Sequence, residues 1–209
     1  MSAVSSFYEY QVFPWLNDKL CADPALQALR SETLAPARGK VVEIGFGSGL
    51  NLPHYPAGVL SLVGVEPNTG MHHRALPRIE GTRLPVQIVP GTAEHMPLPN
   101  AEFDTAVSVL TLCSVGQPRR ALLELRRVLR DDGRLLLMEH GLAQQSGVAR
   151  WQGRLNGVQK VLACGCNLNR NIEDLVRSSG FRFESMRQFY APGIPRTHGW
   201  MTVASAVKA

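Results

Sequence analysis

The chain has 209 residues, of which 44% are hydrophobic and 19% are charged. This length and this ordinary globular mixture predict one folded domain over residues 1–209 and exclude wholesale disorder. No window carries the roughly 18 consecutive apolar residues of a membrane-spanning helix, and the first residues show no signal-peptide pattern. A cytoplasmic location is therefore expected.

The formal charge of +5 is unevenly distributed, because residues 1–104 carry a net charge of −3 and residues 105–209 carry +8. A basic half is typical of proteins that bind nucleic acid or anionic membranes. No block of five or six consecutive positive charges occurs, so we interpret these arginines as solvated helix faces. We expect no nucleic-acid partner and no stable membrane anchoring, and peripheral membrane contact stays open.

Four cysteines occur, Cys21, Cys113, Cys164 and Cys166. They lack the paired C-x-x-C spacing and the spaced histidines of zinc sites. We expect free thiols and no metal site.

Short apolar runs bounded by turn residues predict buried parallel strands at residues 41–44, 60–65, 86–89, 103–112 and 133–138. Helical patterns lie between them, such as the apolar stripe of Ala121, Leu122 and Leu125 after Pro118. This alternation predicts a doubly wound α/β sheet.

The two ends of the chain differ from this alternation. Residues 1–37 are expected to form a helical lid, and residues 141–171 a helical insertion over the active site. One face of that insertion carries Trp151, Leu155, Val158 and Leu162, which are expected to line an apolar acceptor pocket, with a membrane surface as the alternative. A helix over residues 172–179 and antiparallel edge strands at 182–189 and 200–207 follow.

The glycine-rich stretch 41–51 directly follows the first strand. Gly45, Gly47 and Gly49 let the backbone turn sharply and approach a ligand closely. The spacing is G-x-G-x-G rather than the G-x-G-x-x-G of dinucleotide sites. Glu43 projects towards the turn, where it would repel a pyrophosphate and attract a cation. The turn therefore favours a cationic nucleoside over NAD.

Glu66 lies 21 residues after Gly45, at the end of the second strand. An acidic residue at that position accepts hydrogen bonds from ribose hydroxyls.

These motifs, with Gly91-Thr92-Ala93-Glu94 after the third strand, resemble class I S-adenosylmethionine (SAM)-dependent methyltransferases. The resemblance implies a mostly parallel seven-stranded sheet with an antiparallel last strand, SAM as methyl donor and S-adenosylhomocysteine as product. It places Glu43 and the glycine turn around the methionine portion, Glu66 on the ribose, Ala93 and Glu94 on the adenine edge, and Leu110 beneath the cofactor. Asn51 and Pro67 complete the expected cofactor site.

Three further segments, residues 109–115, 138–140 and 165–170, together with Arg196 and His198, are similar to mammalian microsomal thiol S-methyltransferases and their bacterial relatives. This resemblance implies a small-molecule thiol as acceptor. His140, at the end of the fifth strand, is expected to take the thiol proton, and Arg170 and His198 to favour the thiolate. The residues expected to contact the acceptor are Tyr10, Trp15, Cys113, Trp151 and Asn167. Either a monomer or a homodimer fits the sequence.

Other functions remain open at this stage. One is N-methylation of a phospholipid or another small amine, and a second is nucleic-acid binding by a degenerate methyltransferase core. A NAD-dependent oxidoreductase is the remaining alternative for the glycine turn.

Overall fold

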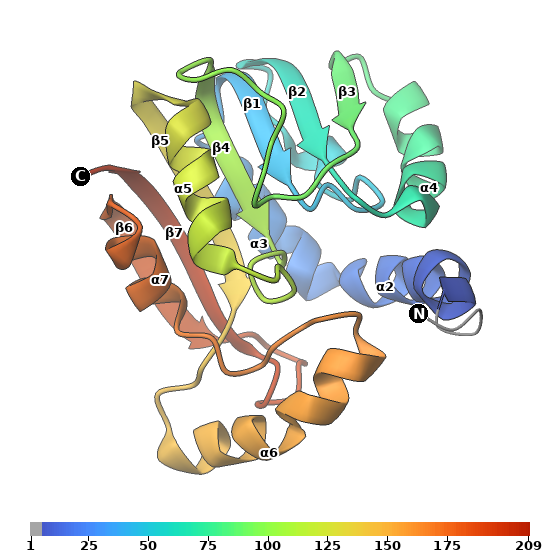
Figure 1. Cartoon of the computed structure of the whole chain (residues 1–209), viewed down its shortest axis with the longest axis vertical. Helices are drawn as coiled ribbons and strands as arrows, with labels where there is room; N and C mark the ends of the chain where they lie inside the picture. Colours follow the sequence, from blue (N-terminus) through green and yellow to red (C-terminus); the bar gives the residue numbers. More distant parts are fainter. Residues whose placement is uncertain (1–5) are drawn as a thin grey trace.

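The computed structural model describes residues 6–209 and shows a twisted seven-stranded sheet with helices on both faces (Figure 1). The strand order is β3-β2-β1-β4-β5-β7-β6. The strands are β1 (Gly39–Ile44), β2 (Val59–Val65), β3 (Val86–Val89), β4 (Phe103–Val109), β5 (Leu129–His140), β6 (Phe181–Tyr190) and β7 (Trp200–Lys208).

Strands β1 to β5 pair in parallel, whereas β7 runs antiparallel to both of its neighbours, β5 and β6. The predicted sheet with an antiparallel last strand is thereby confirmed. Because the parallel strands point the same way, their carboxyl ends meet at one edge of the sheet, where open α/β sheets bind ligands.

The helical elements connect the strands and extend the chain at this edge. They are η1 (Tyr8–Val12), α2 (Phe13–Cys21), α3 (Pro24–Leu34), η2 (Leu52–His54), α4 (Thr69–Glu80), α5 (Pro118–Val128), α6 (Ser146–Leu162) and α7 (Ile172–Ser178). Asp23, Asn68 and Asn171 cap α3, α4 and α7 by accepting backbone N–H hydrogen bonds. Pro118 lies in the first turn of α5, as predicted from its sequence position.

Two hydrophobic clusters fill the space between the sheet and its helices. On one face, α5 and α7 bury Leu122, Leu125 and Val176. On the other face, α3 and α4 contribute Leu34 and Ala75. The sheet is therefore covered on both sides, and the polar side chains at its carboxyl edge are held by a packed core.

The strand predicted over residues 103–112 ends earlier than expected, at Val109. Leu110 follows with a φ of +53°, a conformation that breaks a strand. The buried carboxylate of Glu139 then accepts the backbone N–H groups of Thr111 and Leu112 at 3.0–3.1 Å. The chain leaves β4 as a tight loop over the sheet edge because Glu139 binds its amides. The next strand also begins earlier than predicted, at Leu129, directly after α5.

Helix α6 occupies residues 146–162 of the predicted insertion, and it extends beyond the carboxyl ends of the parallel strands, on the same side as α2 (Figure 1). Its only buried residue is Gln152. Of the predicted apolar stripe, Leu155, Val158 and Leu162 are exposed and line neither pocket described below, so the expectation that they line an acceptor pocket is wrong. Within residues 6–209, no helix combines the length and the apolar character needed to cross a bilayer.

Candidate active site

The glycine-rich turn between β1 and η2 adopts the backbone that its glycines predict. Gly45, Gly47 and Gly49 have φ values of +62°, +57° and +78°. A Cβ atom on Gly45 would lie only 2.3 Å from the Oγ1 atom of Thr111. The turn therefore packs directly on the loop after β4, and no larger residue fits at this position.

Glu43 ends in a buried hydrogen-bond network beside this turn. Its carboxylate accepts hydrogen bonds from Asn51 Nδ2 at 2.7 Å and from the Tyr55 hydroxyl at 2.6 Å. The guanidinium of Arg30 donates to Asn51 Oδ1 at 2.6 Å. Burial raises the pKa of Glu43 to about 7, although both hydrogen bonds oppose the shift. A cation bound nearby would favour the ionised carboxylate.

Glu66, at the carboxyl end of β2, connects the turn to α4. Its two carboxylate oxygens accept the backbone N–H groups of Gly47 at 2.9 Å and Asn68 at 2.8 Å. Burial raises the pKa of Glu66, and these two hydrogen bonds oppose that shift. Since each carboxylate oxygen has a second lone pair, Glu66 keeps the capacity to accept hydroxyl hydrogen bonds from a ribose.

A pocket of about 60 Å³ lies between the turn, α2 and the loop after β4. It brings together the predicted cofactor residues Glu43, Gly45, Gly47, Asn51 and Leu110. Ligand pockets usually measure ~300–1,000 Å³, so a nucleoside needs more room than this pocket offers. Asn17 and Cys21 of α2 form part of its wall, so displacement of α2 would enlarge it.

The N-terminal helices are held over the turn by polar contacts. Asp18 accepts a hydrogen bond of 2.5 Å from Ser48 in the turn and pairs with Arg78 of α4 at 3.0 Å. The backbone carbonyl of Glu9 accepts Asn68 Nδ2 at 2.9 Å. These contacts hold the N-terminal helices against the turn and α4. A lid role for residues 1–37 stays a prediction, and residues 1–5 of that segment lie outside the described part of the chain.

The other predicted cofactor residues do not line this pocket. Gly49 lies at the far side of the turn against Leu52, and Pro67 directly follows Glu66. Ala93 is buried, and Glu94 accepts the backbone N–H of Gln117 at 3.0 Å. Their cofactor contacts stay predictions.

A second group of reactive side chains gathers at the same sheet edge. His140 Nε2, at the end of β5, lies 3.2 Å from the Sγ atom of Cys166. The thiol of Cys113 faces the carbonyl of Leu110 at 3.6 Å. One potential ligand atom from each of Cys113, His140 and Cys166 lies within 4.8 Å of the other two. The structure thus brings the predicted His140 and Cys113 together with a cysteine that was not predicted as a site residue.

The three groups shift one another's protonation. Hydrogen bonding to Cys113 and to His140 lowers the pKa of Cys166 despite its burial. Hydrogen bonding to Cys166, with burial, raises the pKa of Cys113. Burial by itself lowers the pKa of His140, but the thiolate of Cys166 outweighs burial and raises it. The three side chains are therefore close enough for the titration of each to depend on the other two.

The polar residues around this group hold its loops. Arg170 donates from Nη1 to the Leu112 carbonyl, and Asn167 donates to the Cys113 carbonyl from both its backbone nitrogen and Nδ2. His198 lies between Thr197 and Gln159, and burial lowers its pKa. Arg170 and Asn167 therefore lie beside the predicted acceptor site, and the neutral form of His198 is favoured there.

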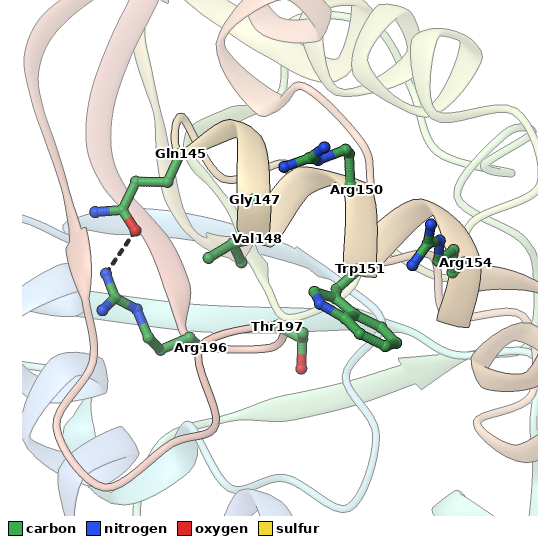
Figure 2. Close-up of a pocket in the computed structure, with 8 residues that line it drawn as sticks. All are labelled: Gln145, Gly147, Val148, Arg150, Trp151, Arg154, Arg196 and Thr197. Atoms are coloured by element: carbon green, nitrogen blue, oxygen red, sulfur yellow. Dashed lines mark hydrogen bonds between the residues drawn. The ribbon is translucent and has the colours of Figure 1, made fainter.

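A second, larger pocket of about 630 Å³ opens beside the start of α6 (Figure 2). It is lined by Gln145, Gly147, Val148, Arg150, Trp151, Arg154, Arg196 and Thr197. Gln145 Oε1 accepts a hydrogen bond of 2.6 Å from Arg196. The three arginines and the indole of Trp151 give this pocket a basic and aromatic wall, separate from the residues of the glycine turn.

Two aromatic residues predicted at the acceptor site lie elsewhere in the N-terminal helices. The ring of Trp15 is 45% exposed and is covered by the ammonium of Lys19. The carbonyl of Tyr10 lies against Gly70, where an added Cβ would be only 2.0 Å away. Neither residue lines either pocket, and both belong to the lid that packs on α4.

Several residues of the site carry no sequence signal of their own. Arg30 is a helix residue upstream of β1, yet it is buried beside Asn51. Tyr55 lies in the loop after the glycine turn, and Asp18 lies on α2. In the sequence, Glu139 is marked only by its position next to His140. Only the folded chain brings these residues to the turn.

Comparison with known proteins agrees with this geometry. The family model described as a methyltransferase domain matches residues 42–137. A phosphatidylethanolamine N-methyltransferase of Cereibacter sphaeroides is 33% identical over 78% of this chain and 77% of its own length. The chain is a class I SAM-dependent methyltransferase. SAM is accordingly the methyl donor and S-adenosylhomocysteine the product, and the NAD alternative for the glycine turn is set aside.

Two further comparisons concern a human thiol S-methyltransferase and a solved bacterial structure. The human thiol S-methyltransferase TMT1A is 31% identical over 73% of this chain and 64% of its own length. The chain thus spans somewhat less than two thirds of that relative. The crystal structure of a SAM-dependent methyltransferase from Thermotoga maritima superposes with a TM-score of 0.70 at 26% identity, covering 98% of this chain and 99% of that chain.

Proposed function

We propose that this methyltransferase transfers the methyl group of SAM to the sulfur of a small thiol. The proposal rests on the charge of the segment that follows β5. Residues 141–171, which follow β5 and include α6, contain no aspartate or glutamate and four basic residues. The neighbouring acid, Glu139, is buried and occupied by the backbone N–H groups of the loop after β4.

This charge suits a thiol better than an amine. A thiol attacks as a thiolate anion, which positive charge stabilises, whereas an amine near neutral pH is an ammonium ion that positive charge repels. Arg170, whose guanidinium lies against the loop that carries Cys113, supplies positive charge there. The similarity to thiol S-methyltransferases from rat and human supports the same acceptor class.

The reaction requires the acceptor sulfur, the methyl carbon and the sulfonium sulfur of SAM to lie in line. A lone pair of the acceptor sulfur forms a bond to the methyl carbon while the bond from that carbon to the sulfonium of SAM breaks. The electron pair of the broken bond stays on the sulfur of S-adenosylhomocysteine. Holding the two sulfurs in line across the methyl group in a site closed by the N-terminal helices supplies much of the acceleration.

N-methylation of a phospholipid amine is the second candidate. The pocket beside α6 carries Arg150, Arg154 and Arg196, whose guanidinium groups suit a phosphate. The similarity to a phosphatidylethanolamine N-methyltransferase favours the same acceptor.

One product assay tests both candidates. The purified protein would be incubated with SAM and, separately, with aliphatic thiols, aryl thiols, small amines and phosphatidylethanolamine in mixed micelles, and the products identified by mass spectrometry. We expect S-methylated products that depend on the protein. N-methylated lipid without any S-methylated product would overturn the thiol proposal in favour of the second candidate.

A further inference from the structure

The three side chains Cys113, His140 and Cys166, which we call the Cys-His-Cys cluster, come from three separate segments. Cys113 lies in the loop after β4, His140 at the end of β5, and Cys166 in the loop after α6. Cys113 lies 27 residues before His140, and Cys166 lies 26 residues after it, so the three residues form no short metal-binding motif in the sequence. Only the fold places their ligand atoms within 4.8 Å of one another.

The backbone fixes this arrangement. The Glu139 carboxylate holds the loop that carries Cys113, and the ladder between β5 and β7 pairs His140 with Met201. Asn167, the residue after Cys166, donates its backbone N–H to the Cys113 carbonyl at 2.8 Å. The two cysteines are therefore tied together by main-chain contacts, and the imidazole is held in a strand. Such preorganisation is typical of ligand sites rather than of chance neighbours.

The dimensions of the cluster fit a tetrahedral metal ion. Zn–S bonds of ~2.3 Å and Zn–N bonds of ~2.0–2.1 Å place tetrahedral ligand atoms about 3.6–3.8 Å apart. Cys166 Sγ and His140 Nε2 are 3.2 Å apart, and no pair in the cluster exceeds 4.8 Å. Side-chain movements of about 1 Å or less would complete the ligand sphere. We propose that Cys113, His140 and Cys166 bind a Zn²⁺ ion.

The chemistry of the donors supports this ion. Two thiolates and one imidazole are soft and borderline ligands that favour zinc over magnesium or calcium. Cys113 and His140 are buried, whereas Cys166 is half-buried and leaves one side of the cluster accessible.

Three protein ligands leave a fourth position open, as catalytic zinc sites do. The cluster adjoins the pocket at the glycine turn, since Cys113 contacts the carbonyl of Leu110, and Leu110 lines that pocket.

We place the acceptor sulfur at this fourth position, a step that rests on the proposed thiol methylation. On coordination the acceptor thiol loses its proton to solvent and binds as a thiolate. Its remaining lone pair then attacks the methyl carbon of SAM. In this arrangement His140 serves as a ligand, and the metal ion takes over the activation of the thiol that the sequence assigns to a free imidazole.

Metal content tests the site without any assay of methylation. The full chain would be purified under reducing conditions, dialysed against Zn²⁺ and analysed by mass spectrometry for bound metal. We expect about one zinc per chain. Cys113→Ser, His140→Gln and Cys166→Ser should each lower zinc affinity at least tenfold, whereas Cys164→Ser, two residues from Cys166 but outside the cluster, should not. Circular dichroism of each variant separates loss of zinc from loss of folding.

A reduced, folded wild-type protein that takes up no zinc overturns the site, as does zinc that remains fully bound to Cys166→Ser. Substitution with Co²⁺ tests the open position, because added thiol should change the visible spectrum of the cobalt protein, and an unchanged spectrum overturns the fourth-ligand assignment. A zinc-free protein that methylates thiols as fast as the zinc-loaded protein refutes the fourth-ligand assignment and leaves the proposed function standing. A zinc-loaded protein that methylates only amines refutes the proposed function, and the fourth-ligand assignment with it, but not the metal site.

Discussion

Ser48, in the glycine-rich turn, donates a hydrogen bond of 2.5 Å to the carboxylate of Asp18 on α2. Because Asp18 also pairs with Arg78 of α4, one carboxylate connects α2 both to the turn and to α4. Asn17 and Cys21 of α2 line the small pocket at this turn, so we expect α2 to move when SAM enters or leaves.

Asp18→Ala should therefore speed both binding and release of SAM. The ion pair is partly exposed and is worth about 1 kcal/mol or less, so we expect rates to rise several-fold. Stopped-flow fluorescence of Trp15, on the same helix, would follow the exchange. Glu32→Gln, which removes a surface pair with Arg187, is the matched control. Equal release rates in Asp18→Ala and wild type would contradict a closing role for this contact.

Glu66→Gln should weaken SAM binding. The substitution removes a charged acceptor of ribose hydroxyl hydrogen bonds, each worth ~1.5–3 kcal/mol, so a roughly ten- to hundredfold rise in Kd is expected. Calorimetry would measure it. Glu102→Gln, which breaks the exposed pair with Lys40, should bind SAM like wild type. Unaltered affinity in Glu66→Gln would show that the ribose is held elsewhere.

Glu43 should make stability depend on pH. Its folded pKa of about 7 lies above the ordinary value of 4.5, so the folded state binds the proton more tightly than the unfolded state. The resulting contribution is complete below pH 4.5 and is lost as pH rises through 7. Relative to Glu43→Gln, wild type should lose about 3 kcal/mol in unfolding free energy over that range. Urea denaturation of both proteins at pH 5 and pH 8 measures this difference, which should vanish if Glu43 stays ionised throughout.

Glycine is required at position 45 but not within α6. Gly45→Ala combines a positive φ with contact against the Thr111 side chain and should cost about 2 kcal/mol or more in unfolding free energy. Gly157→Ala, at a helical position where an added Cβ meets nothing within 4 Å, should stabilise the protein by ~0.5–1 kcal/mol. Thermal unfolding of the pair compares them directly, and a tolerated Gly45→Ala would refute the close packing of the turn.

Sequence patterns predicted the scaffold well for a physical reason. Short runs such as residues 41–44 are buried on both faces and need no distant partner to be recognised. The glycine turn could be predicted equally well, since a backbone with positive φ strongly favours glycine. Glu66 followed from its place after the second strand.

Other features depend on contacts between distant segments, and no local pattern reports them. The early end of β4 follows from the Glu139 carboxylate, 28 residues downstream of Thr111. The Cys-His-Cys cluster draws on two loops and the end of a strand, so its members look like unrelated core residues in the sequence. The stripe on α6 was misassigned because periodicity locates an apolar face without telling what covers it.

Gln152, the only buried residue of α6, should be its main anchor. Its side-chain amide accepts the backbone N–H of Ala143 and donates to the carbonyls of Gly141 and Thr197, all near 2.9–3.0 Å. Gln152→Ala would leave these buried backbone groups unpaired, at ~1–3 kcal/mol each. Hydrogen exchange should then accelerate over residues 146–162 and remain unchanged in the strands. Gln144→Ala, which loses only an exposed contact with Gln188, is the control, and equal exchange in both variants would disprove the anchor.

The exposure of α6 has an evolutionary consequence. Apart from Gln152, every residue of α6 is at least partly accessible to solvent, so most mutations there leave the stability of the sheet almost untouched. Natural selection can therefore remodel this surface, including the pocket that Trp151 lines, in small, individually tolerated steps. The seven-stranded sheet stays intact throughout, which makes α6 a natural starting point for directed evolution of this enzyme.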